Sequence, residues 1–165
     1  MKKFLWGIAI IVIAVIALTA LGEDVNKIER SEGNGTQGNS ENSSVLYHYE
    51  LDVKEYGVIA EENGRNLIAI KYGFKNNDDD AHSFYSGITH SVFQNGVKLK
   101  VAHDYERENE ETYIKSGASV DVVIVYELID TTSDVEVELE LGGTTMYYHE
   151  DVDKKITRII KISGQ

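Results

Sequence analysis

The chain has 165 residues, no cysteine, no proline and a formal net charge of −12 at pH 7. The lack of cysteine excludes disulfides, thiolate metal sites, cysteine nucleophiles and a cysteine-linked lipid. The excess of acidic residues repels phosphate backbones, so we expect no nucleic-acid partner.

The N-terminus has the pattern of an export or anchor segment. Lys2 and Lys3 precede an apolar run from Phe4 to Gly22. As a helix this run would span roughly 28 Å, close to the thickness of a bilayer core. The positive-inside rule places the rest of the chain outside the cytoplasm. Residues 1–22 are therefore interpreted as a cleaved signal peptide or as a transmembrane anchor, with membrane contact through residues 4–22.

The next segment, residues 23–44, is rich in Gly, Ser, Asn and Glu, and almost no large apolar side chain follows Ile28. Such a segment buries too little apolar surface to offset the entropy that it would lose on ordering. We therefore predict a flexible linker, which would hold the folded domain of residues 45–165 away from a surface.

The remaining chain shows mostly a two-residue apolar periodicity, which is typical of β-strands. About seven strands are predicted, within residues 47–54, 66–75, 84–93, 97–101, 119–128, 135–141 and 154–162. Asn95-Gly96 predicts a tight hairpin, because a type I′ turn needs positive φ at both central residues. Apolar residues on both faces of 119–128 predict a central strand. The fold class expected is all-β, an antiparallel immunoglobulin-like β-sandwich, with a small barrel as the second choice.

Four stretches of the predicted strands carry a family resemblance: Ala69–Asn77, Val92–Leu99, Ile114–Leu128 and Thr132–Glu138. They resemble a family of secreted and membrane-anchored domains of unknown function from Gram-positive bacteria. The resemblance implies an immunoglobulin-like fold, akin to extracellular immunoprotective-type Ig-like proteins. Many members of that family are lipoproteins, whereas this chain lacks the cysteine that would carry the lipid. The resemblance implies no catalytic residues.

Asp78, Asp79 and Asp80 are the candidate metal ligands. Calcium takes six to eight oxygen ligands, which an acidic loop can supply together with Asn76 or Asn77. The continuous run of aspartates lacks the alternating spacing that directs ligands inward. The alternative is therefore an acidic loop in contact with solvent, and no cofactor other than calcium is considered.

The five histidines form no recognisable metal motif. They are His48, His82, His90, His103 and His149, and none has the H-E-x-x-H spacing of a helical zinc site. We interpret them as exposed or loop residues. Among the ten tyrosines, strand residues such as Tyr72 and Tyr126 are expected to pack either in the core or on a sheet face.

The sequence contains neither a G-x-S-x-G nor an S-x-x-K nucleophile motif, so we predict no catalytic residues and no enzyme. The leading hypothesis is a non-enzymatic extracytoplasmic binding module, tethered to or secreted from a bacterial cell. Its partner would be an unknown protein or cell-envelope component. The alternatives are a cation-binding, envelope-associated structural protein and an uncharacterised hydrolase. Exposed tyrosines or apolar side chains would favour the binding module.

Overall fold

The computed structural model describes residues 44–142 and 155–162. The predicted signal or anchor segment and nearly all of the predicted linker lie outside these residues, as does His149. No helix among the described residues is long and apolar enough to cross a bilayer.

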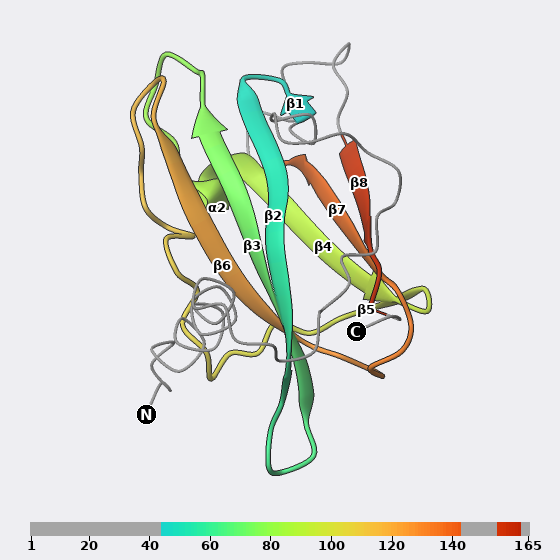
Figure 1. Ribbon diagram of the computed structural model, residues 1–165. Helices are drawn as coiled ribbons and strands as arrows, with labels where there is room; N and C mark the ends of the chain where they lie inside the picture. Colours follow the sequence, from blue (N-terminus) through green and yellow to red (C-terminus); the bar gives the residue numbers. More distant parts are fainter. Residues whose placement is uncertain (1–43, 143–154, 163–165) are drawn as a thin grey trace, which may run out of the picture.

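The described residues fold into two four-stranded antiparallel sheets that face each other (Figure 1). The first sheet has the order β1 (Ser44–Leu46), β2 (Tyr49–Ala60), β3 (Asn66–Asn76) and β6 (Ser119–Glu127). The second has the order β5 (Val97–Lys98), β4 (Ile88–Gln94), β7 (Val135–Leu141) and β8 (Lys155–Ile160). The prediction of an all-β sandwich of antiparallel sheets is confirmed at this level.

The core lies between the sheets, and strand β7 shows how the sequence specifies it. Val135, Val137, Leu139 and Leu141 are all at most 1% exposed, whereas the glutamates between them point outward. This alternation follows from the opposite directions of successive side chains in a strand. Tyr72 and Tyr126 are also buried, so of the two expected positions, core or sheet face, both residues occupy the core.

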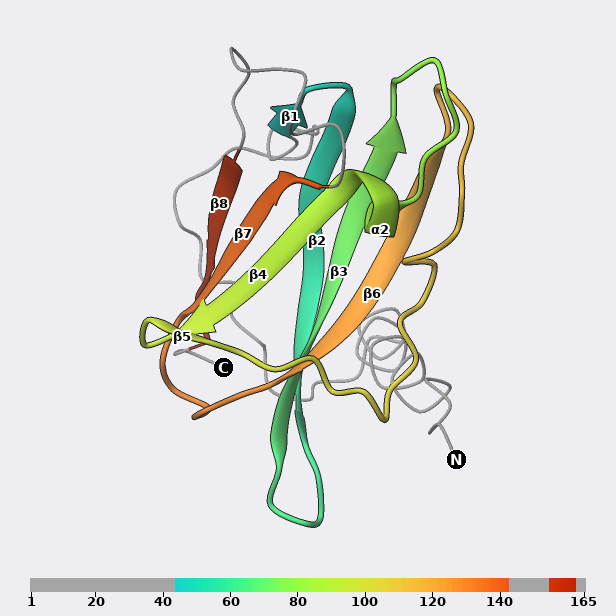
Figure 2. The ribbon, with the colours of Figure 1, turned by 180° about the vertical axis from the view of Figure 1, so that it is seen from behind.

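Strand β6 lies at the edge of its sheet, so the prediction of a central strand is wrong (Figure 2). The outer apolar face of β6 is covered by a loop instead of by another strand. Ala102 of this loop packs with Val125, Leu67 and Ala69 in a second, smaller core. The loop also pairs with the backbone of β6 and so protects an edge that would otherwise be open to other chains.

Three predicted strands differ from the observed elements. Residues 84–93 begin with a helical turn, α2 (Phe84–Gly87), because Ser83 and Ser86 form a capping box. The predicted strand 47–54 contains a turn at Tyr47, which has a φ of 60°, so that β1 and β2 are separate strands. The segment 97–101 pairs with β4 over β5 and through one further hydrogen bond, from the Leu99 amide to the carbonyl of Val92 at 2.7 Å.

The hairpin prediction at the end of β4 is confirmed. Asn95 has a φ of 54° and Gly96 a φ of 74°, so both central residues of the turn have positive φ. This turn and the β6–β7 loop lie at the same end of the molecule, because the Asn95 side chain donates a hydrogen bond to Asp130.

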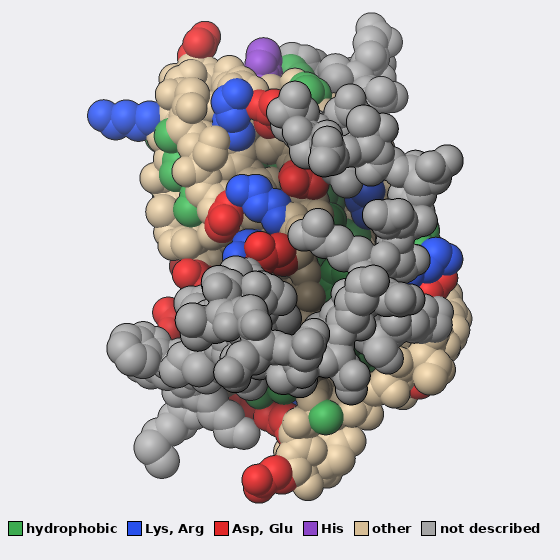
Figure 3. Space-filling view, in the orientation of Figure 1, with side chains coloured by type: hydrophobic (Ala, Val, Ile, Leu, Met, Phe, Trp, Pro, Cys, Tyr) green, Lys and Arg blue, Asp and Glu red, His purple; other side chains and the backbone are tan. Residues whose placement is uncertain are grey.

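The outer face of the first sheet carries basic and acidic side chains side by side over β2, β3 and β6 (Figure 3). Lys54 on β2 reaches across β3 to Asp121 on β6, with an N–O distance of 2.6 Å. Gly73 of β3 makes this crossing possible, since a Cβ at this position would lie 2.7 Å from Cε of Lys54.

Candidate functional site

The candidate site is built on the segment between β5 and β6, residues 99–118, which we call the 99–118 loop. Its backbone follows the edge of β6 in both views of the ribbon (Figures 1 and 2). The Ala102 amide donates to the carbonyl of Val125 at 2.9 Å, and Glu108 and Val123 exchange two hydrogen bonds at 3.0 and 3.1 Å. The far part of the loop pairs with the residues around α2, through the Tyr85 amide and the carbonyl of Glu110 at 2.9 Å.

The buried carboxylate of Glu110 connects the loop to the core through hydrogen bonds. Glu110 is only 2% exposed, and its carboxylate lies 3.2 Å from Nε2 of His90 and 2.8 Å from a guanidinium nitrogen of Arg107. Burial raises the pKa of Glu110, but the hydrogen bond from His90 and the charge of Arg107 outweigh it, so the pKa lies below its ordinary value of 4.5. Glu110 is therefore ionised at neutral pH.

A chain of hydrogen bonds continues from His90 into the core. Nδ1 of His90 lies 2.7 Å from the hydroxyl of Tyr126, which lies 3.1 Å from the hydroxyl of Tyr72. An ionised Glu110 only accepts hydrogen bonds, so Nε2 of His90 donates to it. The hydroxyl of Tyr126 thus shares hydrogen bonds with both His90 and Tyr72. Burial is the main cause that raises the pKa of both tyrosines well above 10.

This arrangement resembles the order of a carboxylate, an imidazole and a hydroxyl in hydrolases, but the hydroxyl group lies in the core. Tyr126 is 1% exposed and Tyr72 is 0% exposed. The hydroxyl of Tyr126 is already hydrogen-bonded to both Nδ1 of His90 and the hydroxyl of Tyr72 inside the protein. The chemical result is a fully hydrogen-bonded buried network, which specifies one position of the loop relative to both sheets.

A second network holds the beginning of the loop. Arg65 donates to Asp104 at 2.5 Å and to Glu61 at 2.8 Å, and the hydroxyl of Tyr105 donates to Glu61 at 2.8 Å. The hydrogen bond from Arg65 is the main cause that lowers the pKa of Glu61 to about 2. Burial and the neighbouring Glu61 raise the pKa of Tyr105 to about 12. These contacts join the loop to the β2–β3 hairpin.

The outer surface of the loop is aromatic and acidic. Tyr113 is 66% exposed, and Tyr85, on the paired segment at α2, is 63% exposed. The side chains of Glu106, Glu108 and Glu111 are also exposed. A hollow of about 620 Å³ lies between loop side chains that include His103, Glu106 and Thr112. The loop thus combines a fixed backbone with tyrosine and carboxylate groups that face solvent.

The predicted calcium ligands lie in the turn after β3. The Asp78 carboxylate accepts a hydrogen bond from the Asp79 amide at 2.7 Å and lies 3.2 Å from Nε2 of His82. Asp79 and Asp80 are exposed. Within residues 44–142 and 155–162, no three His, Cys, Asp or Glu side chains are grouped so that they could hold a metal ion. Calcium binding at these aspartates stays a prediction.

The interpretation of all five histidines as exposed or loop residues is wrong for His90. His103 is exposed on the 99–118 loop, and His48 lies in the β1–β2 turn. His90, however, lies on β4 between Ile88 and Val92, with only 15% of its side chain exposed. The sequence reasoning missed His90 and Glu110, although one signal was present. His90 and Gln94 occupy inward positions of the β4 alternation, where buried polar residues need dedicated partners.

The fold and the site together define a two-sheet β-sandwich domain with a loop fixed by buried polar residues. A family model described as domain of unknown function (DUF5067) matches residues 26–140. The chain therefore belongs to this family. No curated protein sequence matches the chain.

Solved structures with a similar fold come from Gram-positive bacteria. A protein from Bacillus subtilis, titled a "putative lipoprotein (ycdA)", has a TM-score of 0.53 at 13% identity, and the match covers 75% of this chain and 39% of that protein. This chain therefore spans less than half the length of that protein. A "putative lipoprotein" from Staphylococcus aureus has a TM-score of 0.48 at 17% identity, and the match covers 72% and 88% of the two chains. At 13% identity the likeness to the Bacillus subtilis protein concerns the fold alone.

Proposed function

We propose that the chain is a non-enzymatic binding module that acts outside the cytoplasm of a Gram-positive bacterium. Residues 1–22 would export it or anchor it, and residues 45–165 would form an immunoglobulin-like sandwich. The charge pattern around residues 4–22 supports this location. The Bacillus subtilis protein of similar fold bears the name of a lipoprotein, which agrees with a place at the cell envelope. The partner is a protein or another envelope component.

The observation that carries the proposal is the combination of a fixed backbone in the 99–118 loop with two exposed tyrosines, one on this loop and one on the paired turn α2. Glu110 is bonded inward, while Tyr113 and the neighbouring Tyr85 project into solvent. Tyrosine supplies a large, rigid contact area with two rotatable bonds. A loop that is already ordered loses little entropy on binding, so more of the contact energy appears as affinity. This pattern is typical of recognition surfaces.

Cosedimentation of the full chain with detergent-washed cell envelopes from the producing bacterium, in a non-ionic detergent that keeps residues 4–22 in micelles, tests the proposal. The double variant Tyr85→Ala, Tyr113→Ala should bind at least about tenfold more weakly, as expected for the loss of two aromatic contacts. Val45→Ala, Val97→Ala removes two exposed apolar side chains outside the loop and is the control. Equal binding of both double variants and the unchanged chain would contradict the proposal.

Cation binding is the second candidate function, and the turn after β3 supplies its one supporting observation. The side chains of Asp79 and Asp80 accept no hydrogen bond from the described part of the chain, so their oxygens are available. A higher melting temperature in millimolar calcium that is lost in Asp79→Asn, Asp80→Asn would favour this function. An unchanged melting temperature would favour the binding module.

A further inference from the structure

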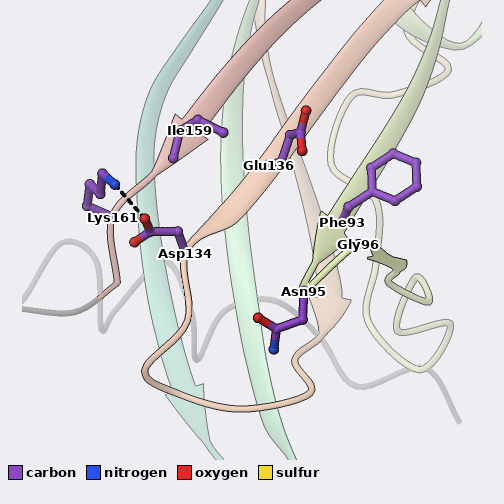
Figure 4. Close-up of a pocket in the computed structure, with 7 residues that line it drawn as sticks. All are labelled: Phe93, Asn95, Gly96, Asp134, Glu136, Ile159 and Lys161. Atoms are coloured by element: carbon purple, nitrogen blue, oxygen red, sulfur yellow. Dashed lines mark hydrogen bonds and ion pairs between the residues drawn. The ribbon is translucent and has the colours of Figure 1, made fainter.

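A hollow on the outer face of the second sheet has a carboxylate between two apolar side chains. Phe93 on β4, Glu136 on β7 and Ile159 on β8 lie in one cross-strand row, because Glu136 is the register partner of both other residues. Figure 4 shows Glu136 between Ile159 and Phe93. The hollow measures about 300 Å³ and ends at Asn95 and at the ion pair of Lys161 with Asp134.

Glu136 is the carboxylate in this hollow that has no basic partner. Within residues 44–142 and 155–162 it forms neither an ion pair nor a hydrogen bond through its side chain. The nearby basic groups are engaged elsewhere. Lys161 pairs with Asp134, Lys98 donates to Ser91, and Lys155 pairs with Glu138. Glu136 is only the weakest of the acidic groups that raise the pKa of Lys155.

The apolar neighbours of Glu136 would strengthen its attraction for a cation. Ile159 is 52% exposed and Phe93 is half-buried, so both present apolar surface to the hollow. Apolar walls exclude water and lower the effective dielectric constant around a bound charge. A phenyl ring also attracts a cation that lies over its face. The hollow therefore suits a group that is both positively charged and partly apolar.

We propose that this hollow binds the guanidinium group of an arginine in a basic segment of a partner protein. Guanidinium is planar, stacks on aromatic rings and bonds a carboxylate with two parallel N–H groups, whereas the ammonium of lysine is compact and strongly hydrated. The net charge of −12 would attract a basic segment from a distance. The hollow lies on the second sheet, apart from the 99–118 loop at the edge of the first, so this inference goes beyond the proposed function.

Fluorescence anisotropy of the full chain in a non-ionic detergent tests the inference. The probe is a fluorescein-labelled Gly-Ser peptide with two arginines, and the comparison peptide has lysine in place of arginine. We expect Glu136→Gln to weaken binding of the arginine peptide by about fivefold and Phe93→Leu by about twofold. The lysine peptide should bind more weakly than the arginine peptide.

Glu140→Gln is the matched control, because Glu140 lies on the outer face of the same strand and the substitution removes the same charge. It should change the affinity by less than about twofold. Equal losses in Glu136→Gln and Glu140→Gln would show general attraction to an acidic surface and would overturn the inference. Equal affinity for both peptides, or no binding of the arginine peptide, would also overturn it.

Discussion

Nε2 of His90 lies 3.2 Å from Oε1 of Glu110, and this contact joins the second sheet to the 99–118 loop. The carboxylate is 2% exposed and the imidazole side chain 15% exposed, so each depends on the other to satisfy its polar atoms. Removal of one partner from a buried pair leaves the other without a hydrogen bond. The position of the loop is therefore coupled to the stability of the core.

Glu110→Gln is expected to lower the free energy of unfolding by about 1–3 kcal/mol at neutral pH, because it replaces the carboxylate that accepts a hydrogen bond from His90 and pairs with the charge of Arg107. The folded-state pKa of Glu110 is depressed, so its contribution is present above pH 4.5 and is lost as the pH falls through the folded pKa. Urea unfolding at several pH values measures the difference in free energy of unfolding between the variant and the unchanged protein. This difference should become smaller in acid. Glu108→Gln, an exposed change on the same loop, is the control, and an equal effect would contradict the coupling.

The two buried tyrosines should differ in their contributions. Tyr72→Phe removes the hydroxyl at the end of the hydrogen-bonded network and should lower the free energy of unfolding by about 0.5–1.5 kcal/mol. Tyr126→Phe removes the middle hydroxyl and leaves both His90 and Tyr72 without that partner, so it should cost about 2–4 kcal/mol. In urea unfolding the double variant should lose less than the sum of the single losses. If the two losses were strictly additive, the hydroxyls of Tyr72 and Tyr126 would not belong to one connected network.

The sandwich was largely predictable from the sequence because each strand alternates clearly. In β7 the valines and leucines face inward and the glutamates face outward, and no other element competes for these residues. Strand β6 was predicted as central because apolar residues on both of its faces show only that both faces are buried. They do not show that the 99–118 loop, and not another strand, covers the outer face. Ala102 and Val125 are brought together only by the complete fold.

The candidate site was less predictable for a related reason. His90 and Glu110 are 20 positions apart and belong to a strand and a loop. No spacing rule joins such residues, because their contact depends on the path of the whole 99–118 loop. The inward positions of His90 and Gln94 on β4 were the available signal. They indicate buried polar groups, and they do not identify the partners.

Gln94 should hold the β6–β7 loop through four hydrogen bonds. Its Oε1 accepts from the amides of Ile129 and Asp130, and its Nε2 donates to the carbonyls of Asp130 and Ser133. Gln94→Leu would leave these backbone groups unpaired and should cost about 2–4 kcal/mol. Hydrogen exchange of the Ile129 and Asp130 amides should become faster. Unchanged exchange at both amides would contradict this role.

Gly73 should affect stability in opposite directions, depending on Lys54. Gly73→Ala places a Cβ where the Lys54 side chain crosses to Asp121, so it should destabilise the unchanged protein by less than about 1 kcal/mol. In a Lys54→Ala background the same substitution should stabilise, because alanine loses less backbone entropy than glycine in a strand. Thermal unfolding of the four proteins measures both effects. If Gly73→Ala changed the stability in the same direction with and without Lys54, this would contradict the path of the Lys54 side chain over Gly73.

Site-specific photo-crosslinking on living cells tests the proposed binding surface most directly. A photoreactive amino acid at Tyr113 lies on the exposed face of the 99–118 loop, and one at Glu62 lies in the exposed β2–β3 turn as the control. We expect one defined crosslinked product from position 113, which should be absent from position 62 and should be lost when Glu110→Gln releases the loop. No product from position 113, or the same product from both positions, would contradict it.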